Sequence, residues 1–267
     1  MSESSLESKI EGANAYESLM VPALFEEWAP RVADAARIRP GERVLDLACG
    51  TGVLGREVAR RVGPGGSVVG LDPSPGMLEV ARRLESGVEW QEGAAESLPF
   101  PDESFDAVVS QFGLMFFEDR SRALREALRV LDREGRLVVA VWDSLDQISA
   151  YRRFVALVER MAGTAAADPI RAPFVLGDED ELIPLFAEAG AESIEVLTHA
   201  GTARFPSVRE MVEADLRGWL PLVGVVLSEE RISAILEEAE RELGRYVMPD
   251  GRMVFDMSAH LITAQKT

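Results

Sequence analysis

The residues of this chain that could bind a charged ligand gather in and after one short apolar segment. Asp46 lies within that segment, and Gly50, Gly52 and Gly55 follow it with the spacing G-x-G-x-x-G. Glycines at such a turn let the backbone approach a ligand closely. Asp72 follows 20 residues after Gly52, where a carboxylate can accept hydrogen bonds from both hydroxyls of a ribose. The pattern predicts a site for a nucleotide-like cofactor.

The glycine spacing alone fits two cofactors, a nicotinamide dinucleotide and S-adenosylmethionine (SAM). Asp46 favours SAM, because a carboxylate before the turn repels a pyrophosphate but can bind the ammonium group of a methionine moiety, directly or through water. The sulfonium charge of SAM is also attracted to a negative site. A nicotinamide-dependent oxidoreductase stays the alternative.

Few side chains suggest a chemical role beyond cofactor binding. Methyl transfer from a sulfonium needs alignment and exclusion of water, and a general base only where the acceptor loses a proton. No nucleophile–base pair is legible. His199 and His260 lie in late predicted strands, where we expect structural roles. Trp142 and Trp219 are candidate walls of a substrate pocket, although packing also explains them.

Charge and composition exclude several partners and sites. The net charge of −18 repels phosphate backbones, so we expect no nucleic-acid partner. The chain has no run of about 18 apolar residues, so we expect no membrane span. Its N-terminus lacks the basic and apolar regions of a signal peptide. One cysteine and two histidines can form neither an internal disulfide nor a closed structural zinc site. We therefore predict a cytoplasmic protein without a metal site.

The elements that must position these residues alternate between strand and helix. Unbroken apolar strands followed by helices predict a parallel sheet that is covered on both faces. The expected strands span residues 43–48, 67–71, 88–91, 105–110 and 137–142, and the expected helices span 21–38, 53–62, 74–84 and 120–132. Residues 1–14 are expected to be weakly ordered.

The second half of the chain does not continue the regular alternation of strand and helix. Helices are expected at 146–161, at 179–189, from the capping box at Ser207 through Trp219, and from Ser228 onward. The last two strands are expected at 194–198 and 253–264, with two helices between them where a simple domain needs only a turn. We interpret 1–267 as a single domain, with a SAM-binding core at 14–142 and a helical lid or substrate-binding insertions at 145–176 and 203–250.

Four segments together resemble the class I SAM-dependent methyltransferases, in the small-molecule branch that includes ubiquinone/menaquinone-type enzymes. They are VLDLACGTG, VVGLDPSPGML, AAESLPFPDESFDAVVS and GRLVVAVW, and the resemblance covers residues 14–142. It implies an α/β, Rossmann-like three-layer sandwich with a mostly parallel seven-stranded sheet of order 3-2-1-4-5-7-6 and a helical lid. It also implies methyl transfer from SAM to an O, N or C atom of a small molecule. The apolar 219–227 segment favours an apolar or aromatic acceptor. A non-catalytic SAM-binding protein is a further alternative.

The resemblance also implies roles for individual positions. Asp46, Cys49, Gly50 and Gly52 are expected to line the methionine and ribose side, Asp72 to hold the ribose hydroxyls, Pro73 and Met77 to pack near the adenine, Ala95 and Glu96 to meet the adenine edge, and Gln111 and Phe112 to flank the methionine end.

Two positions leave alternatives open. Tyr16 is expected to close over the cofactor as the catalytic residue, and the alternative is a half-buried packing residue. The family often has Asp at the position of Ala94, where its carboxylate meets the adenine amino group. The alanine leaves two alternatives, a lower affinity for the cofactor or compensation by Glu96.

Overall fold

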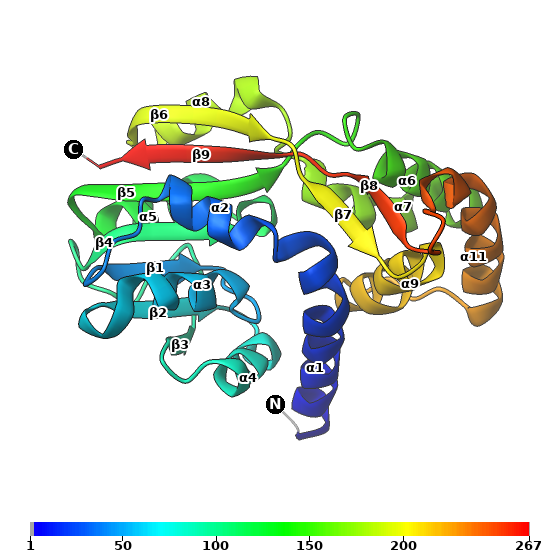
Figure 1. The fold of residues 1–267 in the computed structure, drawn as a ribbon, viewed down its shortest axis with the longest axis horizontal. Helices are drawn as coiled ribbons and strands as arrows, with labels where there is room; N and C mark the ends of the chain where they lie inside the picture. The colour runs from blue at the N-terminus through cyan, green and yellow to red at the C-terminus, as the bar shows by residue number, and fades with distance from the viewer. Residues whose placement is uncertain (1–2, 267) are drawn as a thin grey trace.

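The computed structural model describes residues 3–266. Figure 1 shows a sheet with helices on both faces and, beyond the ends of several strands, a second group of helices with a short two-stranded sheet. We call this second group the cap. It consists of α6 (Ser149–Ala162), α7 (Thr164–Arg171), η4 (Ala172–Phe174), β7 (Thr202–Phe205), α9 (Val208–Glu213), η5 (Ala214–Trp219), α10 (Leu220–Leu222), α11 (Glu229–Leu243), η6 (Gly244–Tyr246) and β8 (Met253–Asp256).

The main sheet has the predicted topology. Its seven strands are β1 (Arg43–Leu47), β2 (Ser67–Asp72), β3 (Glu89–Glu92), β4 (Phe105–Gln111), β5 (Leu131–Trp142), β6 (Glu192–His199) and β9 (Ala259–Gln265), in the spatial order β3-β2-β1-β4-β5-β9-β6. The strands β1 to β5 pair in parallel, whereas β9 is antiparallel to both β5 and β6. Without β7 and β8, which pair outside this sheet, the order is 3-2-1-4-5-7-6. The predicted fold class is confirmed.

Helices cover the sheet because its central strands are apolar on both faces. In Figure 1, α2 (Trp28–Ala35) and α3 (Val53–Val62) lie in front of the sheet, and α5 (Arg120–Val130) and α8 (Glu179–Glu188) lie behind it. The helix α4 (Pro75–Leu84) follows β2, and Ser74 caps it by accepting a hydrogen bond from the amide of Met77. The short 3-10 turns η2 (Gly63–Gly65) and η3 (Leu114–Phe116) complete this part.

The N-terminal segment is more regular than predicted. Residues 3–14, expected to be weakly ordered, belong to α1 (Glu3–Ala15), and Met1 and Ser2 lie outside the described residues. The helix α1 packs against α4, where a Cβ on Gly76 would lie 2.6 Å from the carbonyl oxygen of Lys9. The expected helix at 21–38 is instead a π-helix, η1 (Tyr16–Phe25), followed by α2. The packing of α1 against α4 explains why residues 3–15 are helical although their polar sequence does not predict a helix.

The predicted strand at 253–264 is wrong in one respect. The chain forms β8, leaves the strand at Met257 and Ser258, and re-enters strand structure as β9 in the main sheet. Strand β8 pairs antiparallel with β7, which was not predicted, and α7 was not predicted either. Within residues 3–266, no helix is both long enough and apolar enough to cross a bilayer.

Candidate functional site

The glycine-rich turn connects the end of β1 to α3. The backbone of Gly50 and Gly52 adopts positive φ angles of 54° and 86°, which glycine tolerates without steric cost. The turn is closed by a hydrogen bond from the Gly52 amide to the Cys49 carbonyl, 2.8 Å long. Two non-glycine residues, Ala48 and Phe112, also have positive φ at the ends of the neighbouring strands β1 and β4. Such strained residues often cluster at ligand sites.

The indole of Trp90, on β3, explains part of the glycine spacing. A Cβ on Gly52 would lie 2.3 Å from this ring, and Cβ atoms on Gly55 and Gly70 would lie 2.9 Å and 2.4 Å from it. A Cβ on Gly50, in contrast, would meet no atom within 4 Å. Gly52, Gly55 and Gly70 therefore make room for a buried ring, whereas Gly50 leaves open space on its side of the turn.

Asp72 fastens the turn to the end of β2. One of its carboxylate oxygens accepts a hydrogen bond from the Gly50 amide at 2.9 Å, and the other accepts one from the Ser74 amide at 2.8 Å. Burial raises the pKa of Asp72, and the two amides partly offset this effect. A carboxylate has about four acceptor positions, so both oxygens retain the capacity to accept further hydrogen bonds.

Asp46 is buried beneath the turn. Its side chain is 1% exposed, and neither carboxylate oxygen has a hydrogen-bond partner of normal geometry within residues 3–266. Burial raises its pKa to about 8, while the facing amide of Gly55 lowers it. The negative charge of Asp72 raises the pKa further, and Arg56 lowers it. A buried carboxylate without a partner is costly, so this position suits a positively charged ligand group.

Other buried acceptors without partners lie close to Asp46 along the chain or at neighbouring strand ends. Over the described residues, the side-chain oxygens of Thr51, Ser110 and Gln111 have no hydrogen-bond partner. The amide nitrogen of Gln111 donates to the Phe25 carbonyl at 3.1 Å, which ties the end of β4 to η1. Buried polar atoms are normally paired, so this concentration marks the turn as a ligand site. Cys49 differs, because its buried sulfur packs toward Gly70.

A cavity of about 280 Å³ opens beside the turn. Its lining brings together the ends of β1 and β2, the segment after β3 and the residues around η3, namely Ala48, Leu71, Pro73, Ala94, Ala95, Glu96, Phe116, Phe117 and Glu118. Three residues assigned to the adenine, Pro73, Ala95 and Glu96, thus share one cavity wall. Met77, assigned to the same moiety, is half-buried and does not contribute to this lining.

Glu96 is already engaged at the cavity. One of its carboxylate oxygens accepts hydrogen bonds from the amides of Glu118 and Asp119, at 3.0 and 3.4 Å. The contact joins the segment after β3 to the start of α5. Ala94 presents only a methyl group at this wall.

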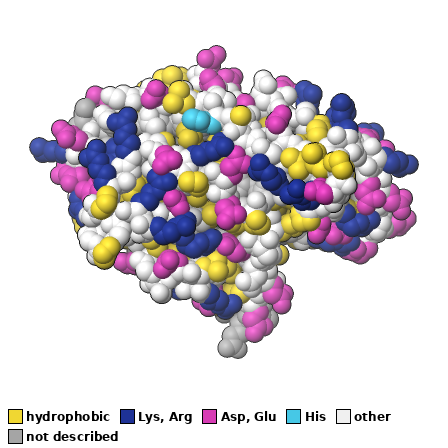
Figure 2. Space-filling view, viewed as in Figure 1, with side chains coloured by type: hydrophobic (Ala, Val, Ile, Leu, Met, Phe, Trp, Pro, Cys, Tyr) yellow, Lys and Arg dark blue, Asp and Glu magenta, His cyan; other side chains and the backbone are white. Residues whose placement is uncertain are grey.

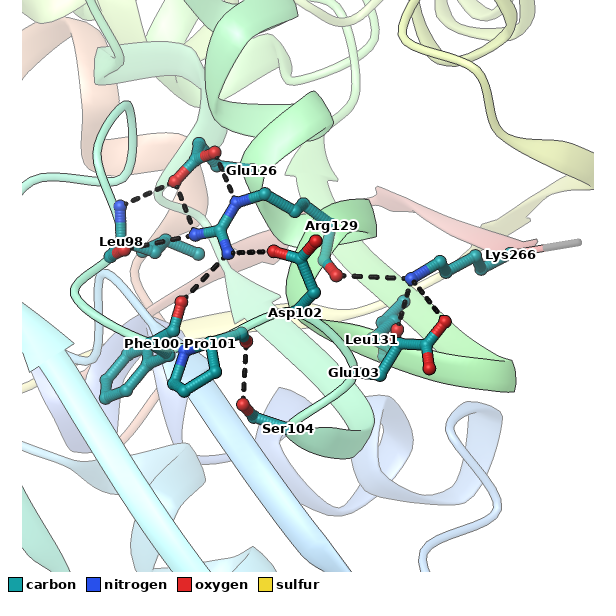
Figure 3. A network of polar contacts seen from close by, with 10 residues as sticks. All are labelled: Leu98, Phe100, Pro101, Asp102, Glu103, Ser104, Glu126, Arg129, Leu131 and Lys266. Carbon is teal, nitrogen blue, oxygen red and sulfur yellow. Dashed lines mark hydrogen bonds and ion pairs between the residues drawn. The ribbon is translucent and has the colours of Figure 1, made fainter.

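Arg129 of α5 holds the segment that follows the cavity wall (Figure 3). Its guanidinium donates to the carbonyls of Leu98 and Phe100 at 3.1 and 2.9 Å, and to the carboxylates of Asp102 and Glu126. Glu126 in turn accepts a hydrogen bond from the Leu98 amide at 2.8 Å. The planar fork of arginine can satisfy several acceptors at once. Arg129 therefore fixes the loop that begins at Glu96.

The segment η1 covers the glycine-rich turn. Glu17 forms an ion pair with Arg56 at 2.7 Å, and Arg56 also donates to the Thr51 carbonyl at 2.7 Å. The ring of Tyr16 stacks on Phe25 with 5.4 Å between centroids. Burial raises the pKa of Tyr16, and the negative charges of Asp72 and then Glu17 raise it further. The predicted catalytic residue thus lies in the field of the predicted ribose-binding carboxylate.

The two tryptophans assigned to a substrate pocket lie in different surroundings. Trp142, 3% exposed, stacks on Phe112 with 3.6 Å between ring centroids and an interplanar angle of 8°. Trp219 in the cap is half-buried and donates its indole N–H to the Pro169 carbonyl. Its ring lies against that of Phe116, with 5.3 Å between the ring centroids. Since Phe116 lines the cavity, Trp219 connects the cap to that wall.

The histidines lie on adjacent strands, one register position apart. His260 on β9 is opposite Thr198 on β6, and His199 is opposite Ala259. His260 is buried between Thr198 (Nδ1 to Oγ1, 2.9 Å), the Gly177 carbonyl (Nε2, 3.2 Å) and Asp143. These partners are those of a structural residue.

Sequence reasoning missed Trp90, the ion pair of Glu17 with Arg56, and the place of Glu118 in the cavity wall. The spacing of Gly52, Gly55 and Gly70 around one ring was the available signal for Trp90, but only the fold brings them together. The run Met115–Phe117 was expected in the core or a pocket wall, and Phe116 and Phe117 do line the cavity.

Comparison with known proteins agrees with this geometry. Residues 45–139 match a family model described as a methyltransferase domain. The chain is 34% identical over 202 residues to the ubiquinone/menaquinone biosynthesis C-methyltransferase of Cronobacter sakazakii, covering 68% of this chain and 79% of that protein.

Two further relatives match over a shorter region. The C-methyltransferase of the same name from Hahella chejuensis is 43% identical over 127 residues, and the demethylmenaquinone methyltransferase of Thermotoga maritima is 47% identical over 114 residues. These matches cover 45% and 42% of this chain, and the chain spans about half the length of each relative, 51% and 49%.

Solved structures share the fold at low sequence identity. The YcgJ protein from Bacillus subtilis has a TM-score of 0.59 at 22% identity, with 90% of this chain and 98% of that chain covered. The [4+2]-cyclase SpnF has a TM-score of 0.56 at 22% identity, with 91% and 80% covered. A fold shared with a protein named as a cyclase does not fix an activity, but the sequence relationship does fix the family. The chain belongs to the class I SAM-dependent methyltransferase family.

Proposed function

We propose that this protein binds SAM and transfers its methyl group to a small-molecule acceptor. The observation that carries the proposal is Asp46, a buried carboxylate without a partner of normal geometry among the described residues, placed under the glycine-rich turn. A site with a buried, unpaired carboxylate is complementary to a ligand that carries an ammonium and a sulfonium group, because a bound cation stabilises the ionised carboxylate. A pyrophosphate would be repelled by the ionised carboxylate.

The residues around the turn fit the parts of SAM. Asp46, with the carbonyl oxygen of the Gln111 side chain, would accept hydrogen bonds from the ammonium group. Asp72 would accept hydrogen bonds from the ribose hydroxyls while it keeps the Gly50 and Ser74 amides. Pro73 and the segment of Ala95, which share one cavity wall, would hold the adenine.

Other predicted contacts rest on backbone or packing. Gly50 offers open space for close approach, and Gly52 shapes the turn around Trp90. Cys49 contributes its backbone, Met77 packs at the rim of the adenine site, and Phe112 flanks the methionine end. Glu96 aligns the adenine wall through the Glu118 amide rather than replacing the missing carboxylate at position 94.

The chain's own groups position the acceptor and exclude water, while SAM, when bound, supplies an electrophilic methyl group on a sulfonium sulfur. The segment η1 covers the turn, and its Tyr16, which stacks on Phe25, closes over the cofactor as the catalytic residue. Trp142 and Phe112 provide a rigid apolar wall at the ends of β5 and β4. Exclusion of water strengthens the electrostatic interactions inside the site.

The cap is the lid over the acceptor. Its helices, within 145–176 and 203–250, lie beyond the ends of strands β4 and β5 (Figure 1), where ligands bind in open sheets. Trp219 faces the cavity wall through Phe116. These rings favour an apolar or aromatic acceptor, and the relatives named for quinone biosynthesis point to the same class.

Nucleic acid is an unfavourable partner. The net charge is −18, and Figure 2 shows acidic side chains interspersed with basic ones over the face in view rather than a broad basic surface. A polyanion needs such a surface for tight binding. The cytoplasmic location stays a prediction from the sequence.

The test is a methyl-transfer assay with purified protein and SAM labelled in the methyl group. Hydroxylated and amino-substituted aromatic compounds serve as trial acceptors, and mass spectrometry follows labelled product and S-adenosylhomocysteine together. The proposal expects both to accumulate in equal amounts with at least one acceptor. If the protein binds SAM but no compound class is methylated, a non-catalytic SAM-binding protein becomes the better description.

A further inference from the structure

A second buried carboxylate without a full set of partners lies in the cap. Asp215 on η5 is 5% exposed, and its Oδ2 atom has no hydrogen-bond partner within the described part of the chain. Tyr151, which is 4% exposed, donates a side-chain hydrogen bond from its hydroxyl to the same carboxylate. One oxygen of a buried acid is thus left available for a further donor.

The segment η5, which carries this carboxylate, adjoins elements that surround the cofactor cavity. The segment packs against η1, which covers the glycine-rich turn. A π-helix has somewhat more than four residues in a turn, so Asp215 and Trp219 lie on nearly the same side of η5. Trp219 contacts Phe116, which lines the cavity.

Tyr151 approaches the same region from the other side. It lies in the first turn of α6, soon after β5 ends at Trp142. Its ring packs against those of Phe174 on η4 and Phe255 on β8, with 5.2 Å and 5.9 Å between ring centroids. The turn η4 in turn packs against η3 and β5. The pair of Tyr151 and Asp215 therefore lies in the cap among aromatic rings, next to η4, which packs against the sheet strand β5.

A purely structural role explains this arrangement poorly. A structural carboxylate in a protein interior normally has its oxygens satisfied, and an incompletely paired one lowers stability. Stability is commonly given up where a site binds a ligand. The pKa of Asp215 is raised to about 7, because burial raises it more than the hydrogen bond from Tyr151 lowers it. An acid with such a pKa is able to exchange a proton near neutral pH.

From this geometry we infer that Asp215, oriented by Tyr151, binds a hydroxyl group on an aromatic methyl acceptor and takes up its proton. The O–H bond of the acceptor breaks, its electron pair stays on oxygen, and the proton moves to Oδ2 of Asp215. The resulting phenolate is more electron-rich than the phenol and hence a better methyl acceptor. After product release the carboxylic acid returns its proton to water. The inference rests on the proposed function and deepens it.

Other titratable groups near η5 are engaged elsewhere. On η1, Glu17 pairs with Arg56, and Tyr16 stacks on Phe25. On α9 and η5, Glu213 pairs with both Arg209 and Arg217, and these two arginines also pair with Glu240 and Glu229, respectively. The carboxylate of Glu210 accepts a hydrogen bond from the Ser207 hydroxyl. Together with Tyr151 of α6, these are the groups that a pH experiment must consider.

The experiment measures the binding of 1-naphthol and of 1-methoxynaphthalene to the full chain saturated with S-adenosylhomocysteine. The two probes differ in the O–H group. The wild-type protein is expected to bind 1-naphthol at least tenfold more tightly. Asp215→Asn is expected to remove this preference while it binds S-adenosylhomocysteine and 1-methoxynaphthalene within twofold of wild type. Glu213→Gln, which removes a charge from the same helical region at a surface ion pair, is the matched control and should behave as wild type.

The pH profile adds a second readout that a structural role would not produce. The preference for 1-naphthol should rise as the pH increases through about 7, and Asp215→Asn should show no such rise. Tyr151→Phe removes the hydrogen bond that lowers this pKa, so its profile should shift to higher pH. This variant also tests the inference if Asp215→Asn fails to fold.

The outcomes separate the inference from the proposed function. A wild-type protein that binds S-adenosylhomocysteine without preferring 1-naphthol overturns the role of Asp215 and leaves the cofactor assignment intact. An unchanged preference in Asp215→Asn, or an unshifted profile in Tyr151→Phe, overturns it as well. Failure to bind S-adenosylhomocysteine would overturn the proposed function, and the inference with it.

Discussion

The indole of Trp142 lies nearly parallel to the phenyl ring of Phe112, with 3.6 Å between the ring centroids. The stack joins the ends of the adjacent strands β4 and β5. Trp28 of α2 meets both rings edge-on, at 5.8 and 5.9 Å, and Phe25 of η1 tilts against them. Packed rings of this kind are rigid. The end of the sheet is thus a preformed wall, and η1 is fitted to it.

Asp46 should make the ligand-free protein less stable as the pH rises. Its pKa is about 8 in the folded chain and about 4 when unfolded, so the folded state binds the proton more tightly. This contribution to stability is full below pH ~4 and is lost as the pH rises toward ~8. Asp46→Asn should therefore be more stable than wild type at pH 9, by about 2–5 kcal/mol, and little different at pH 4. Urea unfolding of both proteins at the two pH values measures the free energy of unfolding. A difference between variant and wild type that is the same at pH 4 and pH 9 would contradict the prediction.

The same carboxylate should make SAM affinity depend on pH. A bound cation requires ionised Asp46, so below pH ~8 binding releases a proton and affinity falls by up to about tenfold per pH unit. Above that pH the amino group of SAM begins to lose its own proton. Titration calorimetry in buffers of different ionisation enthalpy counts the released protons. Asp46→Asn should bind SAM more weakly and release fewer; identical proton release would exclude Asp46 as the source.

Gly52→Ala should be more damaging than Gly50→Ala. Both positions have positive φ, which costs a non-glycine residue about 1–2 kcal/mol. At position 52 the new Cβ also meets the Trp90 ring at 2.3 Å, and such overpacking adds about 1–3 kcal/mol. Denaturant unfolding of the two variants gives the comparison. Equal losses of stability would show that Trp90 yields without cost.

Asp72→Ala should weaken SAM binding by about 1–3 kcal/mol, because the ribose hydroxyls lose a charged acceptor in a buried site. The substitution also deprives the Gly50 and Ser74 amides of their partner. Asp72→Asn, which keeps one acceptor oxygen, is the control that separates turn geometry from ribose recognition. Calorimetric titration with SAM measures both variants, and unchanged affinity in both would remove the ribose assignment.

Tyr16→Phe should lower turnover more than it lowers SAM affinity. The substitution keeps the ring that stacks on Phe25 and removes only the hydroxyl. Steady-state methyl transfer gives the turnover, and calorimetry gives the affinity. Equal rates in variant and wild type would make Tyr16 a packing residue.

The sequence predicts much of the fold because its signals are local. Apolar runs mark strands β1 to β5, and Ser74, Ser207 and Ser228 cap the helices that follow them. Long-range contacts carry no such mark. The helix α1 depends on the bare backbone of Gly76. The end of β8 is a change of partner strand within residues 256–259, which contain no glycine or proline to mark it.

The site is predictable to a similar extent. Pro73, Ala95 and Glu96 share a cavity because parallel strands end at one edge. The state of each side chain could not be predicted, because it depends on tertiary neighbours. Glu96 is engaged by the Glu118 amide, and Asp46 has no normal partner among the described residues. Asp215 escaped prediction, since its burial arises from packing within the cap.

The most direct test of the central claim is calorimetric titration of the purified chain with SAM, S-adenosylhomocysteine and NADH. The account predicts one site for each adenosyl ligand and no binding of NADH, because Asp46 repels a pyrophosphate. Binding of NADH without SAM would contradict it, and so would the absence of binding by all three ligands.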